Sequence, residues 1–169
     1  MEPISEFSFV THDGPYEQWP EKTELLRNGE RTGAFVPGYV IEAQYRCLHG
    51  VLLVTSYDCP FEESNDFILL TDEYTLLAHT QLVVPYGSYL LHAHWPLDSH
   101  QLRLHYHTRL FYTLSIKPPS GLFGSRFRLS LQCEGALRGD ARATASVAEL
   151  ERQLESIREA TSRTASSPG

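Results

Sequence analysis

Among the residue types that can do chemistry, the histidines have the spacing in this sequence that best indicates a possible site. Five of the eight histidines fall within residues 88–110, and four of these form two pairs with one residue between the members. The pairs are His92 with His94 and His105 with His107. Neutral imidazoles on neighbouring strands are good ligands for zinc, copper, nickel or iron. The spacing therefore raises the hypothesis of a metal site, which depends on the strands that carry these residues.

Side-chain alternation in the two predicted strands, 88–95 and 101–108, decides where the histidines point. Successive side chains of a strand point to opposite faces. The apolar set is Tyr89, Leu91, Ala93 and Trp95 in the first strand and Leu102, Leu104 and Tyr106 in the second. We expect this set to face the core and all four histidines to lie together on the outer, polar face. Arg103 shares that face and would repel a cation, so we interpret the histidines as a solvated ladder that binds no metal or cofactor.

A metal-dependent, cupin-like enzyme is the alternative. Gly87, the His92-x-His94 pair and Asp98 loosely resemble the first cupin motif, with an aspartate where a glutamate is usual. This alternative would use His92, His94, His105, His107 and Asp98 as ligands. Cupin ligands point into the barrel, however, whereas alternation turns these side chains outward. The sequence has no GxGxxG, P-loop or GxSxG motif, so we predict no catalytic residues and no enzymatic activity.

Length and composition are those of one ordinary globular domain. The chain has 169 residues, of which 41% are hydrophobic, enough to bury a core of its own. No apolar run approaches the ~20 residues that span a bilayer. The N-terminus, MEPISEFSF, lacks the basic start and apolar stretch of a secretory signal, and we expect a cytoplasmic protein without membrane association. Cys47, Cys59 and Cys133 have no metal-binding spacing and are expected to be free thiols.

Short runs of β-branched, aromatic and leucine residues, bounded by Gly, Pro, Asn or Asp, dominate the chain. The predicted strands are 6–10, 39–47, 51–57, 66–71, 74–82, 88–95, 101–108, 110–117 and 126–133, with one helical turn around 21–27. Regularly spaced strands without intervening helices are typical of antiparallel sandwiches. We predict an all-β fold, a jelly-roll-like antiparallel β-sandwich of about eight strands with one C-terminal α-helix.

The C-terminal part changes from strand to helix patterning. Ser146 and Glu149 have the spacing of a capping box, and an apolar stripe follows at Val147, Leu150, Leu154 and Ile157. The predicted organisation is a β-sandwich at 1–134, a linker at 135–144, an amphipathic helix at 145–160 and a disordered tail at 161–169. We expect the helix to dock on the sandwich or to pair weakly in a dimer.

Charge is distributed unevenly along the sequence. The net charge is −7. Residues 1–75 hold 14 acidic and 4 basic side chains, a balance of −10, and residues 76–169 hold 7 and 10, a balance of +3. The acidic first half disfavours direct binding of nucleic acid. It suits a basic protein partner, whose approach such a field would speed.

The predicted partner-binding residues come from this acidic half. They are Asp58, Phe61, Glu62, Glu63 and Asp66 in the segment DCPFEESND, with Asp72 and Glu73 at the next turn. The carboxylates would imitate a polyanionic substrate, and Phe61 would serve as an aromatic anchor. The alternative is a solvated loop with Phe61 packed beneath it.

Several motifs, in their order along the chain, resemble the competence protein J family. They are Trp19 followed by acidic residues, the glycines 29, 33 and 38, the stretch GYVIEAQ, the segments VLLVTSYDCPFEE and FILLTDEYTLL, and VPYGSYLLHAHW. The resemblance covers about residues 7–108. It implies a small β-rich inhibitor of a DNA-uptake nuclease. Our leading hypothesis is therefore a non-enzymatic immunity or inhibitor protein that blocks a cognate nuclease or toxin, with a generic ligand- or partner-binding sandwich as a further alternative.

Overall fold

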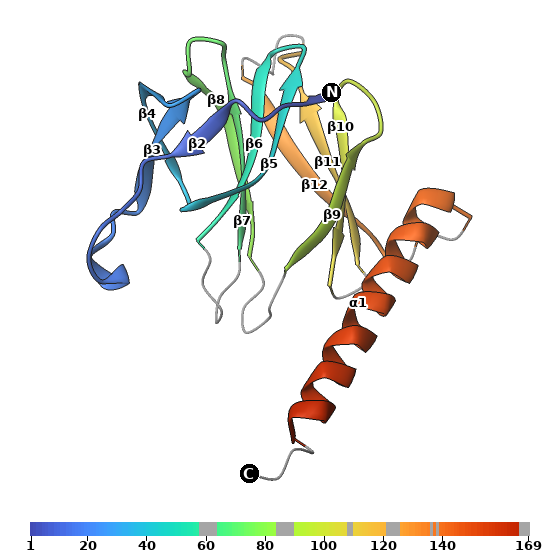
Figure 1. Ribbon diagram of the computed structural model, residues 1–169. Helices are drawn as coiled ribbons and strands as arrows, with labels where there is room; N and C mark the ends of the chain where they lie inside the picture. The colour runs from blue at the N-terminus through green and yellow to red at the C-terminus, as the bar shows by residue number, and fades with distance from the viewer. Residues whose placement is uncertain are drawn as a thin grey trace.

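The computed structural model describes residues 1–57, 64–83, 90–107, 110–120, 126–135, 137 and 139–165. Within these residues the chain forms three antiparallel sheets and one long helix. Figure 1 shows them side by side as a small sheet, a central sheet, a second sheet and the C-terminal helix. An all-β sandwich with a C-terminal helix, as the sequence predicts, is therefore confirmed.

Two large sheets enclose the main hydrophobic core. The central sheet has the order β1-β5-β6-β7-β8, with bounds Glu2–Pro3, Val40–Cys47, Gly50–Ser56, Asn65–Leu70 and Leu76–Leu82. The second sheet has the order β12-β11-β10-β9, with bounds Arg128–Gly135, Phe111–Lys117, Gln101–Tyr106 and Leu91–Pro96. Inward side chains of both sheets, among them Tyr45, Phe67, Leu104 and Leu114, are at most 2% exposed. Burial of this apolar surface is the main force that holds the two sheets together.

The small sheet covers the outer face of the central sheet. It consists of β2 at Phe7–Phe9, β3 at Lys22–Arg27 and β4 at Glu30–Pro37. A second core of Phe7, Leu25, Val36, Val51, Leu53, Ile68 and Leu70 lies between the two sheets. Because β6 and β7 are covered on both faces, all of their residues are buried. Near-continuous apolar runs are typical of strands in that position.

The helical turn predicted around 21–27 is wrong, because this segment forms β3. Its Thr23 and Leu25 are both fully buried, which is a strand alternation. The hairpin to β4 turns at Asn28 and Gly29, whose φ angles are 50° and 85°. Two consecutive positive φ angles with Asn-Gly define the turn that best matches the twist of paired strands.

Helix α1, Ala141–Ala165, packs on the outer face of the second sheet. Trp95, Phe111 and Ala143 form the contact, and Leu150 is fully buried. The C-terminal half of the helix extends past the sheet, as Figure 1 shows, and Ile157 in that half is 61% exposed. The prediction that the helix docks on the sandwich is thus confirmed for its first half.

The predicted helix boundaries are wrong at both ends. The helix begins inside the predicted linker, where Oδ1 of Asp140 accepts hydrogen bonds from the backbone N–H groups of Arg142 and Ala143, both at 2.9 Å. Asp140 is therefore the N-cap, and Ser146 of the predicted capping box lies inside the helix. At the other end the helix continues through Ala165. No helix in the described part of the chain is long and apolar enough to span a bilayer.

Candidate protein-binding surface

An aromatic cluster lies at one end of the central sheet, beside the short 3-10 helix η1, Tyr16–Gln18. Its members are His12, Tyr16, Trp19, Tyr39 and Tyr57. Tyr39 is central, with its ring centroid 5.1 Å from those of Trp19 and Tyr57 and 5.6 Å from that of Tyr16, all three close to perpendicular. Edge-to-face packing at this separation is the favoured geometry for aromatic rings. The rings of the cluster therefore hold one another in position.

Hydrogen bonds from the ring substituents hold the loop before β3 in place. The Trp19 indole N–H donates to the carbonyl of Gly14 at 3.1 Å. The Tyr39 hydroxyl donates to the carbonyl of Pro20 at 3.1 Å, and the Tyr57 hydroxyl donates to that of Glu21 at 2.9 Å. Three side chains thus satisfy three carbonyls of one exposed loop, which lowers the entropy that a partner would have to remove on binding.

Gly38, which precedes Tyr39 of the cluster, lies in close contact with Thr55. Gly38 has a φ of 103°, and a Cβ there would come within 2.8 Å of the Thr55 side chain. Only glycine fits this corner. The Gly38 carbonyl accepts the hydroxyl of Thr23 at 2.7 Å, and that hydroxyl lies 2.9 Å from Nε2 of His12. His12 is therefore anchored to the sheet corner.

Three carboxylates surround the cluster, Asp13, Glu17 and Glu21, and all three are exposed. Among the residues that the structure describes, none of them is in an ion pair. Burial and, after it, the Glu21 charge raise the pKa of Tyr39. We call the five rings and three carboxylates together the aromatic–acidic surface. Its chemistry suits the basic side chains of a protein partner.

A cleft of about 340 Å³ adjoins this surface and shares Glu21 and Tyr57 with it. It lies between β4 and the strands β7 and β8, with Phe35, Ile68, Leu70 and Leu76 among its apolar lining residues. Asp66 is 2% exposed in this cleft, and its Oδ1 lies 2.5 Å from Nε2 of His79. A buried carboxylate at the floor of a partly apolar cleft is a recognition feature for a cation.

Of the acidic residues predicted to bind the partner, those that the structure describes lie at two separate places. Asp58, Phe61, Glu62 and Glu63 lie outside the described residues. Asp66 is the second residue of β7 and is buried in the cleft, whereas Asp72 and Glu73 follow the other end of the same strand. Six strand residues extend roughly 20 Å. Asp66 therefore lies far from Asp72 and Glu73, and these three residues do not share one surface.

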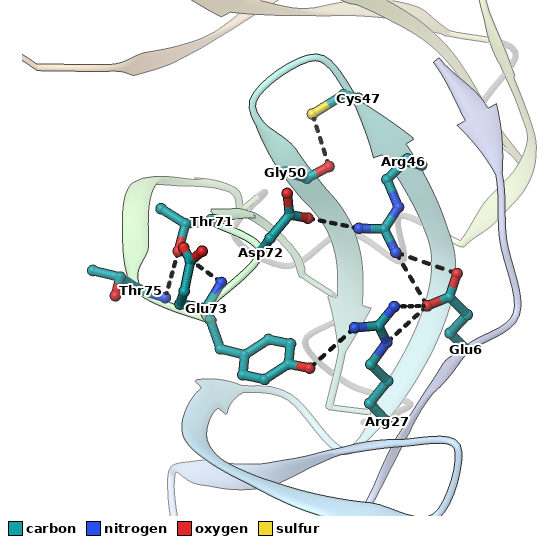
Figure 2. A network of polar contacts seen from close by, with 10 residues as sticks. Glu6, Arg27, Arg46, Cys47, Gly50, Thr71, Asp72, Glu73 and Thr75 are labelled. Atoms are coloured by element: carbon teal, nitrogen blue, oxygen red, sulfur yellow. Dashed lines mark hydrogen bonds and ion pairs between the residues drawn. The ribbon is translucent and has the colours of Figure 1, made fainter.

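Asp72 belongs to a charge network at the end of the sheet opposite the aromatic–acidic surface. Its Oδ1 accepts Nη1 of Arg46 at 2.7 Å, and Glu6 binds both Arg46 and Arg27, at 3.1 and 2.8 Å. Figure 2 shows Asp72, Arg46, Glu6 and Arg27 connected in this order. The hydrogen bond from Arg27 is the main factor that lowers the pKa of Glu6. These carboxylates are neutralised within the chain.

The histidines are divided between the two faces of the second sheet. His94 pairs with Leu104 and points into the sandwich, where its Nδ1 lies 2.5 Å from the Tyr45 hydroxyl. His105 pairs with Ala93 and lies under helix α1. A β-bulge separates the two arrangements, because Tyr106 pairs with Leu91 and leaves His92 as the extra residue. A bulge re-aims side chains, so the prediction that all four histidines share one face is wrong.

Of the histidines on the face that helix α1 covers, His105 is buried, and His92 and His107 are half-buried. His105 is fully buried, stacks on Phe111 at 4.2 Å, and its Nδ1 lies 2.7 Å from the Ser146 hydroxyl. His92 lies 5.1 Å from His105 between ring centroids and bonds the Ser146 carbonyl. Burial, with the neighbouring imidazoles, lowers the pKa of His105 to about 4. The predicted solvated ladder is wrong because the helix covers this face.

The proposed cupin-like ligand set is not brought together. His94 is separated from His92, His105 and His107 by the sheet itself, and Oδ1 of Asp98 accepts the backbone N–H groups of His100 and Gln101 in the turn after β9. Within the described ranges, no group of three or more His, Cys, Asp or Glu side chains is placed to hold a metal ion.

The aromatic–acidic surface itself was not predicted from the sequence. Most of it comes from one stretch, HDGPYEQWPE at 12–21, which combines three carboxylates with two large aromatic residues and a histidine. Exposed Trp and Tyr beside charge are typical of protein interfaces, and this composition was the available signal. Tyr39 and Tyr57 join the stretch only through folding.

No protein-family model, curated protein or solved structure matches the chain. The resemblance to the competence protein J family therefore stays a prediction from the quoted motifs.

Proposed function

We propose that this chain is a cytoplasmic, non-enzymatic binding protein that inhibits a basic partner protein, a nuclease or a toxin, by covering it with the aromatic–acidic surface. The observation that carries this proposal is the group of exposed carboxylates, without an ion pair among the described residues, around a hydrogen-bonded aromatic cluster. The inhibition would be steric and electrostatic, without a chemical step.

The composition of the surface supports protein binding over a solvated loop. Trp and Tyr are the residues that most often carry binding energy in interfaces, and here they are held in fixed positions. Tyr16 remains 43% exposed, so its ring is available to a partner. The carboxylates around the rings would speed the approach of a positively charged surface.

The resemblance to nuclease inhibitors adds to this proposal, because such proteins act by binding and need no catalytic group. The predicted acidic segment also supports the proposal, because it is adjacent in sequence to the aromatic cluster. Asp58 follows directly on Tyr57, a member of the aromatic cluster, and Glu62 and Glu63 precede Ser64. We therefore keep Asp58, Phe61, Glu62 and Glu63 as proposed partner contacts beside those that the structure describes.

The test is inhibition by the purified chain. The partner is captured from the native host, identified by mass spectrometry, purified, and assayed for DNA cleavage with increasing amounts of the chain. We expect a basic protein whose cleavage of DNA stops at about one equivalent of the chain, and whose complex weakens as salt rises because exposed charges are screened. A captured partner that cleaves DNA at an undiminished rate in the complex would overturn the proposal.

Two double variants locate the contact. Glu62→Lys with Glu63→Lys tests the predicted loop. Glu2→Lys with Glu73→Lys, at exposed residues outside the aromatic–acidic surface, is the matched control. Loss of inhibition in the first variant alone supports the loop as a contact. Equal inhibition by both variants removes the loop from the mechanism.

A further inference from the structure

We propose that the cleft between β4 and the strands β7 and β8 binds the side chain of an arginine from the partner protein. This inference rests on the proposed function and names the group that the partner would present. It assigns the cleft as the anchor pocket beside the aromatic–acidic surface, with which the cleft shares Glu21 and Tyr57.

The floor of the cleft has one charged and two apolar positions. Asp66, Ile68 and Leu70 alternate along β7, so their side chains lie on one face of the central sheet. Ile68 and Leu70 are at most 1% exposed, and Phe35 and Leu76, which also line the cleft, are more than half exposed. A side chain that enters beside them needs an aliphatic stem and a charged end, which arginine and lysine have.

One oxygen of the Asp66 carboxylate, Oδ2, has only a long hydrogen bond among the described residues. Its Oδ1 makes the short contact with His79, but in the described part of the chain its Oδ2 accepts only the Gln81 amide, at 3.4 Å. That distance is beyond the usual range of an N–H···O hydrogen bond. A carboxylate that is 2% exposed gains most from a charge-assisted donor, because burial makes an unsatisfied charge costly.

The other charged groups of the cleft are compatible with a bound cation. Glu21 adds a second carboxylate, and Lys22 adds one ammonium group at an exposed position. The lining thus holds the carboxylates of Glu21 and Asp66, the ammonium group of Lys22 and the imidazole of His79, which is paired with Asp66. Two carboxylates beside one ammonium group are an environment that suits a cation.

Guanidinium fits this cleft better than ammonium. The planar guanidinium group offers several donors in a fixed fork and stacks on aromatic faces, whereas ammonium is compact and more strongly hydrated. Phe35, Tyr57 and Tyr74 supply aromatic lining to the cleft. Arginine is the basic residue that is enriched in interface anchors.

The test uses a blocked arginine, N-acetyl-arginine methylamide, as the probe. It is titrated into the purified full chain and followed by NMR on the Ile68 methyl and His79 imidazole signals, with the matching lysine and norleucine derivatives as controls. We expect saturable binding of the arginine probe at about millimolar concentration, several-fold weaker binding of the lysine probe and none of the norleucine probe. Equal shifts with all three probes would overturn the guanidinium assignment.

Three variants test the charges of the cleft. Asp66→Asn keeps the shape of the side chain and should weaken arginine binding by about tenfold, which is the loss of one charge-assisted hydrogen bond. Glu21→Gln at the exposed position should weaken binding about threefold, and Lys22→Ala should strengthen it by a similar factor. If Asp66→Asn fails to fold, the two exposed variants still decide the matter, because unchanged affinity in both would overturn the inference.

The captured partner distinguishes this inference from the proposed function. Partner inhibition that Asp66→Asn leaves unchanged would overturn the arginine anchor and leave the proposed function standing. A partner that is not inhibited at all would overturn the proposed function, whereas saturable arginine binding that depends on Asp66 would still support a guanidinium site in the cleft.

Discussion

The two ends of the central sheet use acidic residues in opposite ways. At the end that holds Glu6 and Asp72, Arg27 and Arg46 neutralise the carboxylates within the chain. At the other end, Asp13, Glu17 and Glu21 surround aromatic rings, and the described residues provide them with no ion-pair partner. Negative charge in the sequence is therefore structural at one end and available to a partner at the other.

This contrast explains why net charge alone is a weak guide to a binding surface. Exposed ion pairs contribute little to stability, but they do remove charge from the field that a partner meets. Only carboxylates without a partner in the chain contribute their full charge to that field. The loops around Trp19, and not the turn at Asp72, are for this reason the surface that we propose for binding.

The largest expected effect is loss of partner binding after charge reversal at the aromatic–acidic surface. The double variant Glu17→Lys and Glu21→Lys should lower affinity for the captured partner at least about 100-fold, roughly 3 kcal/mol, because attraction becomes repulsion at the contact. Isothermal titration calorimetry measures this change. The contrast between the ends fails if the control variant, Glu2→Lys with Glu73→Lys, loses as much affinity.

Mild acid should weaken the fold through the histidines under helix α1 and leave both ends of the central sheet intact. Because the pKa of His105 is about 4 in the fold and 6.5 when unfolded, the unfolded chain binds the proton first. Stability is thus complete above pH 6.5 and is lost as the pH falls towards 4. We expect the free energy of unfolding to drop by about 2 kcal/mol between pH 7.5 and 5.

Urea unfolding at a series of pH values checks this prediction. The pKa values of His94 and His107 are also lowered, mainly by burial, and act in the same direction. His105→Phe keeps the stacking position on Phe111 and should remove most of the loss. An equally steep loss of stability in this variant would contradict the assignment to His105.

A smaller effect is expected from loosening the loop that carries Trp19. Tyr57→Phe keeps the ring contact with Tyr39 but removes the hydrogen bond to the Glu21 carbonyl. Affinity for the partner should fall about fivefold, roughly 1 kcal/mol, because the loop has to be ordered on binding. Surface plasmon resonance should show a faster dissociation rate, and an unchanged rate would mean that the hydrogen bond does not preorganise the surface.

The smallest effect is expected at the neutralised end. Glu6→Gln removes the carboxylate that Arg27 and Arg46 share and should lower the thermal midpoint by about 3 °C, with partner affinity unchanged. Because the pKa of folded Glu6 lies below 4.5, its contribution is present above that pH and is lost below it. Thermal melts of wild type and variant should therefore converge near the acid limit, and a parallel difference at every pH would contradict the ion-pair explanation.

The strands that build the sandwich were predictable because their residues are buried on one or both faces. The predicted runs at 51–57 and 66–71 correspond to β6 and β7. A short, nearly continuous apolar run is typical of a strand that is covered on both faces. Strands β3 and β4 were missed, because the small sheet buries only one of its faces and charged residues alternate there with the buried Thr23 and Leu25. In such half-exposed strands, local propensity decides little.

The site was less predictable than the fold because its parts meet only across long sequence distances. Arg46 neutralises Asp72 from 26 positions away, and Tyr45 meets His94 from 49 positions away. No periodicity encodes such pairs. The one-residue bulge at His92 had the largest consequence, since it separates His92 from His94, which strict alternation had placed together.

The sequence by itself determined the short strands of a sandwich, the presence of a terminal amphipathic helix, and an acidic first half. Each of these follows from local periodicity and composition, which are properties of neighbouring residues. The tertiary structure alone decided which carboxylates are paired with arginines, which histidines helix α1 covers, and how Tyr39 and Tyr57 complete the surface around Trp19. Those outcomes depend on contacts between distant segments, which exist only once the sheets have paired and packed.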